Sequence, residues 1–278
     1  MIYIIRPINL LLLLAVLFTL WFRLCVPNLA EAKLIEFILI SVSVICTAAA
    51  AYIINDIIDS ETDKINKPKK VYVDKYISKK NALILYIFLN ALAITAATFV
   101  LDPFIIIISV FSIALLYLYS LKLKQSIFWG NLTVALLSAL PILEMYIFFK
   151  PFGLEMEFIA YALFAFLTSL IREIVKDKED AEGDLKSGIN TLANSISEKH
   201  LKIILMSVNG LLFLSLLSFL FLLEIETNIT LGIYLMTIVL PGILLFFLIG
   251  RLKNKKSYSN ASLYLKVYMF LGLIRLWL

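Results

Sequence analysis

The sequence predicts an all-α integral membrane protein, folded as a single bundle of nine transmembrane helices. Three observations lead to this prediction. Of the 278 residues, 62% are hydrophobic and only 16% are charged, which is more apolar surface than a soluble core of this size can bury. The apolar residues fall in stretches of about twenty, the length that an α-helix needs to cross a bilayer. Most connections between these stretches are short, so we expect one domain over residues 1–278.

Nine apolar stretches are the expected spans. The first stretch contains Arg6 and Pro7 and lacks a small-residue cleavage site, which favours a membrane span over a cleaved signal. The nine ranges are 8–25, 34–55, 81–101, 103–120, 128–149, 158–175, 202–223, 229–249 and 261–277. Two connections, 56–80 and 176–201, are long and rich in charged residues.

Lysine and arginine are distributed unevenly between the two sides of the predicted bundle. The loops after the even-numbered spans, with their flanks, contain 19 of the 25 basic residues, whereas the loops after the odd-numbered spans contain three. Because loops rich in lysine and arginine stay in the cytoplasm, we expect a cytoplasmic N-terminus, an outside C-terminus and a cytoplasmic active-site mouth. The net charge of +5 suits a protein at an anionic membrane surface better than a nucleic-acid binder, since the basic residues border spans.

Two groups of acidic residues follow predicted spans. The first acidic group, at the end of the second span, consists of Asn55, Asp56, Asp59 and Asp63. The second acidic group, at the end of the sixth span, consists of Asp177, Asp180 and Asp184. On a helix each group lies within about 100° of arc, and the aspartates of both groups have the same spacing. Acidic loop residues are commonly plain solvated charges, but a repeated spacing on the same side of the membrane favours a shared chemical role.

Carboxylates in this arrangement are typical ligands of hard divalent cations. Mg²⁺ is bound through oxygen, usually by one or two carboxylates together with water and substrate phosphate. The two groups therefore predict Mg²⁺ ions that clamp a diphosphate, with lysine and arginine adding positive charge. The apolar bundle beside them accepts a hydrocarbon tail, so a lipid diphosphate matches both parts of the pattern. His200 is the single histidine, which excludes a histidine-rich metal site.

With these motifs the sequence resembles the UbiA superfamily of intramembrane prenyltransferases. Residues 55–63 (NDIIDSETD) are similar to the first aspartate-rich motif of that superfamily, and residues 177–184 (DKEDAEGD) to the second. The segment 6–9 (RPIN) fits the same pattern. Residues 172–184 (REIVKDKEDAEGD) are most similar to the branch that makes ether lipids by transferring a geranylgeranyl group to geranylgeranylglyceryl phosphate.

The resemblance implies Mg²⁺-dependent prenyl transfer from an allylic prenyl diphosphate to a lipid or aromatic acceptor. The implied metal ligands are Asn55, Asp56, Asp59, Asp63, Asp177, Asp180 and Asp184. The expected catalytic residues among them are Asp59, Asp63, Asp177 and Asp180. Asp56 lies at the edge of its arc, so it either binds the metal or orients a metal-bound water.

Basic residues near the acidic groups are the expected phosphate ligands. Lys124 follows the fourth span, where the superfamily has a diphosphate-binding residue. Lys70 lies in the segment NKPKKV, where the superfamily has arginines, and lysine keeps the charge but loses the fork geometry. Arg172 and Lys176 either pair with the second acidic group or bind a phosphate. Arg6 resembles the arginine that meets an acidic acceptor headgroup.

Two other functions fit parts of the pattern. Other branches of the superfamily prenylate an aromatic quinone precursor, and the shape of the acceptor pocket decides between the two acceptors. A cation transporter would use the acidic residues as ion sites, but such sites lie near the bilayer midplane, whereas both acidic groups lie at span ends. Glu144 and Lys266 lie inside predicted spans, where charge is costly and usually functional.

Overall fold

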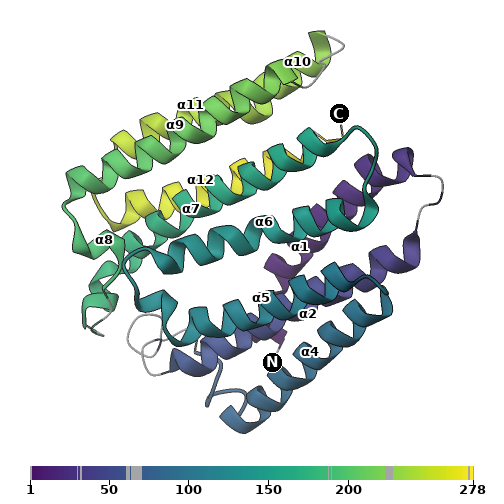
Figure 1. Cartoon of the computed structure of the whole chain (residues 1–278). Coiled ribbons are helices and arrows are strands. Elements are labelled where there is room, and N and C mark those ends of the chain that lie inside the picture. Colours follow the sequence, from purple (N-terminus) through teal and green to yellow (C-terminus); the bar gives the residue numbers. More distant parts are fainter. Residues whose placement is uncertain are drawn as a thin grey trace. The chain divides into compact units, whose positions relative to one another are not determined.

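The computed structural model describes most of the chain as helix (Figure 1). The described residues are 2–29, 31, 33–60, 63, 71–186, 188, 190–222, 228–274, 276 and 277. Within them the only extended pairing is an isolated bridge between Val73 and Ile77. The contacts divide the chain into two compact units, and the expectation of one domain stays a prediction. Unit 1 comprises Met1–Lys124 and Glu144–Lys150, and unit 2 comprises Gln125–Leu143 and Pro151–Leu278.

Unit 1 is built around one central helix, α2, which packs against α1, α4 and α5 (Figure 1). Its elements are the turn η1 (Ile2–Ile5), α1 (Pro7–Leu20), the π-helical turn η2 (Trp21–Cys25), η3 (Val26–Asn28), α2 (Leu34–Ile58), α4 (Lys79–Phe99), α5 (Pro103–Leu121) and η5 (Leu123–Gln125). Two helix starts are capped by side chains: Ser78 accepts from the Asn81 amide at 3.2 Å, and Asp102 from the Phe104 amide at 2.8 Å.

The last turns of α2 are surrounded by residues from distant parts of unit 1. Ile53 on α2 belongs to a buried cluster with Ile4, Val73 and Ile77. This cluster holds η1 and the segment after residue 70 against α2. Because Arg6 directly follows η1, the same packing places Arg6 beside the acidic end of α2.

Unit 2 contains the longest helix, α7, which packs against α8, α9 and α12. Its elements are α6 (Trp129–Phe149), α7 (Glu155–Lys186), α8 (Leu192–Ser195), α9 (Glu198–Leu222), α10 (Asn228–Tyr234), the π-helical turn η6 (Leu235–Val239), α11 (Leu240–Gly250) and α12 (Lys255–Ile274). The final residues of α6, from Glu144, belong to unit 1.

The helix α10–η6–α11 is interrupted by a π-helical turn and by Pro241, and side chains of α12 stabilise the interruption. The Tyr268 hydroxyl donates to the Ile238 carbonyl at 2.8 Å, and the Tyr264 hydroxyl donates to the Pro241 carbonyl at 2.7 Å. Pro241 donates no backbone hydrogen bond to the preceding turn, and the two hydroxyls add hydrogen bonds to carbonyls beside that position. These two bonds therefore hold α12 against the π-helical turn and Pro241.

Within the described residues, eight helices are long and apolar enough to cross a membrane. They correspond to the first eight predicted spans, so the fold is that of a helical membrane protein. The expected ninth span corresponds to α12, which is not among the eight because its first turns (KKSYSN) are polar. A further difference concerns α7, which continues to Lys186 instead of ending near residue 175.

Candidate active site

The first acidic group lies where α2 ends. The helix ends at Ile58, and the Asp59 amide donates to the Asn55 carbonyl at 2.8 Å. The same bond repeats one turn later, from the Asp63 amide to the Asp59 carbonyl at 2.8 Å. Asp59 and Asp63 thus each donate to the carbonyl four residues earlier, so Asn55, Asp59 and Asp63 follow one another along one face.

Asp59 is buried and accepts two donors on one oxygen. Asn55 Nδ2 donates to Asp59 Oδ2 at 2.8 Å, and Lys124 Nζ forms a short ion pair with the same oxygen. Lys124 lies in η5, directly after α5. The structure thus brings together Lys124 and Asp59, two of the predicted site residues, from helices far apart in the sequence.

Asp56 is buried as well, but its partner comes from a different element. Arg6 Nη2 donates to Asp56 Oδ1 at 2.9 Å. The Arg6 guanidinium carbon lies 4.6 Å from the centre of the Tyr52 ring, and Asn9 Nδ2 donates to the Tyr52 hydroxyl at 3.3 Å. Arg6 and Asn9 at the start of α1 therefore contact Tyr52 and Asp56, which are neighbours one turn apart on α2.

The second acidic group lies inside one unbroken helix, α7. Asn131 Nδ2, on the first turn of α6, donates to Asp177 Oδ2 at 2.7 Å. Asn131 is buried, and it was not among the predicted site residues. The available signal was an amide at the start of an otherwise apolar span, which is too common a pattern to identify a partner.

Arg172 and Lys176 contact the same buried carboxylate. Arg172 Nη1 lies 2.7 Å from Glu173 Oε1, and Lys176 Nζ lies 3.2 Å from Glu173 Oε2. The sequence left open whether the second acidic group pairs with these cations, and the structure adds Glu173 as a partner of both. The side chains of Arg172 and Lys176 are 22% and 38% exposed. Both side chains are therefore partly accessible, although Arg172 Nε is buried without a hydrogen-bond partner in the described part of the chain.

The donor atoms of both groups suit Mg²⁺, because every side chain in them offers oxygen from aspartate or asparagine. Among the residues that the structure describes, no three His, Cys, Asp or Glu side chains lie in an arrangement that could hold a metal ion. The fit to Mg²⁺ therefore rests on the type of donor atom, since Mg²⁺ usually takes one or two carboxylates together with oxygens from water and substrate phosphate. Lys70, the other predicted diphosphate ligand, lies outside the described residues.

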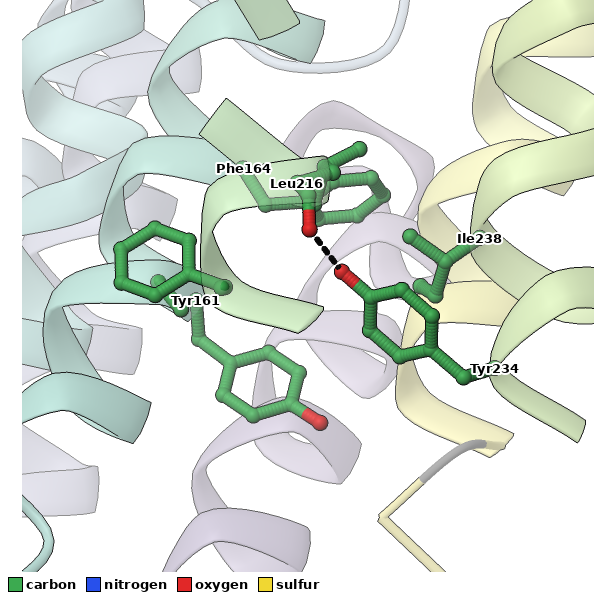
Figure 2. A pocket seen from close by; sticks show the side chains of 7 residues that line it. Tyr161, Phe164, Leu216, Tyr234 and Ile238 are labelled. Atoms are coloured by element: carbon green, nitrogen blue, oxygen red, sulfur yellow. Dashed lines mark hydrogen bonds between the residues drawn. The ribbon is translucent and has the colours of Figure 1, made fainter. Parts of the chain in front are cut away.

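Two further features of the units contain none of the predicted site residues. Glu144 is buried in α6, and its Oε1 has no hydrogen-bond partner in the described part of the chain. Unit 2 also contains an apolar pocket, in which the Tyr234 hydroxyl donates to the Leu216 carbonyl at 2.6 Å (Figure 2). The residues that line it are Ala160, Tyr161, Phe164, Leu216, Phe219, Tyr234 and Ile238. This lining offers hydrocarbon contacts and no phosphate ligands.

Comparisons with known proteins match nearly the whole chain. The profile of the UbiA prenyltransferase family matches residues 15–274. Digeranylgeranylglyceryl phosphate synthase of Thermococcus kodakarensis is 33% identical over 239 residues, which are 85% of this chain and 83% of the relative. The protein of the same name from Saccharolobus solfataricus is 34% identical over 229 residues, covering 82% of this chain and 78% of the relative.

Solved structures show the same fold. A structure of digeranylgeranylglyceryl phosphate synthase, 25% identical, matches with a TM-score of 0.76 over 98% of this chain and 94% of that chain. A UbiA homolog from Archaeoglobus fulgidus bound to GPP and Mg²⁺, 16% identical, matches with a TM-score of 0.68 over 99% of this chain and 98% of that chain. The family match and the similarity in sequence both extend over most of the chain. This protein belongs to the UbiA prenyltransferase family.

Proposed function

We propose that this protein transfers a geranylgeranyl group from its diphosphate to geranylgeranylglyceryl phosphate. One observation carries the proposal: over 85% of the chain, the sequence is 33% identical to a relative named digeranylgeranylglyceryl phosphate synthase. The geometry of each unit supports it. Lys124 lies against Asp59 in unit 1, and Arg172 and Lys176 precede Asp177 in unit 2. Each unit therefore combines carboxylates for a metal with cations for a phosphate.

The proposed roles follow from these contacts. The Mg²⁺ ligands in unit 1 are Asn55, Asp59 and Asp63, and those in unit 2 are Asp177, Asp180 and Asp184. When bound, Mg²⁺ neutralises the charge that develops on the leaving diphosphate. Lys124 and Lys70 contact the oxygens of the donor diphosphate. Arg172 and Lys176 bind the phosphate of the acceptor, and lysine and arginine suit this role as charge-assisted donors.

The proposed reaction is an allylic substitution. The bond between the first carbon of the prenyl group and the diphosphate oxygen breaks, and the diphosphate leaves with the electron pair. The hydroxyl oxygen of the acceptor then bonds to the prenyl carbon and loses its proton to the released diphosphate, which gives an ether. Lys124 would exchange Asp59 for a diphosphate oxygen as the donor binds, and the surrounding apolar helices would exclude water that competes with the acceptor.

The membrane arrangement is part of the same proposal. We place the N-terminus and both acidic groups on the cytoplasmic side, with α12 as a ninth span. The distribution of 19 basic residues in even-numbered loops against three in odd-numbered loops supports the orientation. A helix of 20 residues is long enough to span the hydrocarbon core, which supports the role of α12.

The test is an assay with two competing acceptors. Purified protein in detergent receives Mg²⁺ and geranylgeranyl diphosphate, with geranylgeranylglyceryl phosphate and 4-hydroxybenzoate offered in parallel, and products are identified by mass spectrometry. We expect a diether phosphate product. The double variant Asp59→Ala/Asp180→Ala should give none. The variant Glu198→Gln, which removes a carboxylate at the start of α9 outside both acidic groups, should retain the product.

Each outcome has a distinct meaning. A prenylated aromatic product would keep the chemistry but move the protein to the quinone-making branch. Binding of the donor in a Mg²⁺-dependent manner, without a product from either acceptor, would show that the acceptor is a different one. Absence of any Mg²⁺-dependent donor binding would overturn the proposal altogether.

A further inference from the structure

We propose that Asp56 does not bind Mg²⁺ but is a positioning residue, which holds Arg6 so that it selects an acceptor carrying a phosphate. The inference rests on the proposed function, because it adds Arg6 to the groups that recognise the acceptor. It also separates Asp56 from the aspartates with which it shares a motif.

The first argument is that the neighbouring carboxylates of Asp56 and Asp59 have cationic partners from different elements. Asp59 accepts from Lys124, which follows α5, whereas Asp56 accepts from Arg6, which precedes α1. On a helix the group spans about 100°, with Asn55 at one edge and Asp56, about 60° from Asp59, at the other. Asp56 is therefore at the edge of the face that carries the other oxygen ligands, and it contacts a different helix.

The second argument is that Arg6 is held by several contacts at once. Its carboxylate partner is 2.9 Å away, and its guanidinium lies over the Tyr52 ring at 4.6 Å. Asn9 fixes that ring through its hydroxyl at 3.3 Å. An arginine that is held on one edge and stacked on one face loses little further freedom when it binds a ligand, which increases affinity through preorganisation.

The third argument is the backbone at Arg6. Its φ of 51° and ψ of 64° lie in the left-handed region, which is unfavourable for a side chain other than glycine. Such a conformation persists where the surrounding contacts impose it, and it occurs preferentially at binding sites. Pro7 starts α1 immediately afterwards. The strained residue is thus the same one that carries the guanidinium.

The fourth argument is exposure. The Asp56 side chain is 7% exposed, whereas the Arg6 side chain is 41% exposed. A guanidinium has five N–H donors, and one ion pair leaves several of them available. A phosphate is the anion that such a planar fork binds through two parallel hydrogen bonds. Asp56 therefore remains covered while the guanidinium keeps donors for an acceptor phosphate.

The experiment measures two quantities for the same variants. The first is the Mg²⁺-dependent binding of geranylgeranyl diphosphate, by calorimetry and without an acceptor. The second is the discrimination ratio, defined as kcat/KM with geranylgeranylglyceryl phosphate divided by kcat/KM with the alcohol that lacks the phosphate. The variants are Asp56→Asn, Arg6→Gln, their combination and Tyr52→Leu, with Asp59→Asn as the matched control on the same helix.

We expect Asp56→Asn to leave Mg²⁺-dependent donor binding within about twofold of the wild type, whereas Asp59→Asn abolishes it. The discrimination ratio should fall about tenfold in Asp56→Asn, the value of one charge-assisted hydrogen bond. Arg6→Gln should lower it at least as much. Adding Asp56→Asn to Arg6→Gln should change it no further, because a residue that acts through Arg6 has no effect in its absence.

Loss of Mg²⁺-dependent donor binding in Asp56→Asn, to the extent seen in Asp59→Asn, would overturn the inference. So would independent effects of Asp56→Asn and Arg6→Gln that multiply. If Asp56→Asn fails to fold, Tyr52→Leu decides the matter: it should lower the discrimination ratio several-fold without altering donor binding, and an unchanged ratio would contradict us. Failure of the proposed function is distinguishable, because the wild type would then show no donor binding or no product.

Discussion

The first acidic group, in unit 1, lies across the end of α2, whereas the second acidic group, in unit 2, lies inside α7. The aspartates of the two groups have the same spacing. The partners differ accordingly. Asp56 and Asp59 are each paired with a cation from another element, Arg6 and Lys124. In unit 2 the cations Arg172 and Lys176 pair with Glu173 on their own helix. Two groups with the same aspartate spacing therefore differ in how the neighbouring cations are paired.

The difference shows two ways in which the proposed phosphate-binding cations are held close to the proposed metal-binding carboxylates. In unit 1 the cations neutralise the carboxylates directly, so a metal has to displace Lys124 from Asp59. In unit 2 a separate carboxylate, Glu173, holds the cations, and Asp177 receives an uncharged amide from Asn131 instead. If the proposed roles hold, unit 1 exchanges partners on binding, whereas unit 2 is organised beforehand.

The largest expected effect is that of Asp59→Asn. Without this carboxylate the proposed metal site in unit 1 loses a central ligand and Lys124 loses its partner. Electrostatic stabilisation by a metal contributes several kcal/mol, so kcat/KM should fall at least about 100-fold. Steady-state kinetics with saturating Mg²⁺ measure it, with Glu198→Gln as the control. Near-normal activity of Asp59→Asn would mean that unit 1 does not bind the metal through this residue.

Lys124→Met tests whether the cation in unit 1 exchanges partners. With Lys124 removed, Asp59 is free to bind Mg²⁺, so the affinity for Mg²⁺ alone should rise several-fold. The affinity for the donor diphosphate should fall about tenfold, because one charge-assisted contact is lost. Calorimetric titrations with Mg²⁺ alone and with donor plus Mg²⁺ measure both. If both affinities fell together, Lys124 would only support the local structure.

Much of this fold was predictable from the sequence because a bilayer imposes strict rules. The chain must satisfy its backbone internally and must span about 30 Å of hydrocarbon, so apolar stretches alone predicted the eight spanning helices, seven of them to within a few residues. The end of α7 was missed for a physical reason. Residues 176–186 are almost all charged or small, a composition that a loop and an exposed helix share.

The contacts within the candidate site were harder to predict than its residues. The spacing identified both acidic groups, yet Arg6 and Asp56 are 50 residues apart and Asn131 and Asp177 are 46 residues apart. Such contacts depend on which faces two helices turn towards each other, and hydropathy carries little information on that in a membrane, where lipid and protein are equally apolar. Glu173 was overlooked because a glutamate among lysines and arginines usually indicates a solvated surface.

Asn131→Ala tests how the second acidic group of unit 2 is held in place. We propose that the amide fixes the orientation of Asp177, as residues that hold metal ligands commonly do. Removal of such a contact typically lowers metal affinity 10- to 100-fold, so the Mg²⁺ concentration for half-maximal activity should rise about tenfold. The matched control is Asn90→Ala, which removes an amide that donates to the Tyr86 carbonyl of its own helix. An unchanged Mg²⁺ dependence would leave Asn131 with a packing role.

Glu173→Gln is expected to have the smallest effect and bears most directly on the contrast between the units. Glutamine keeps the shape of Glu173 and can still accept a hydrogen bond, but it removes the charge that holds Arg172 and Lys176. Both cations are partly exposed and near other carboxylates, so the loss of stability should be modest, about 1 kcal/mol.

The cations would then be free to pair with the second acidic group, as the cations of unit 1 do with theirs. We therefore expect KM for the phosphate-bearing acceptor to rise a few-fold with little change in kcat, and Mg²⁺ affinity to fall. If KM and Mg²⁺ affinity both stayed unchanged, Glu173 would have no role in positioning Arg172 and Lys176.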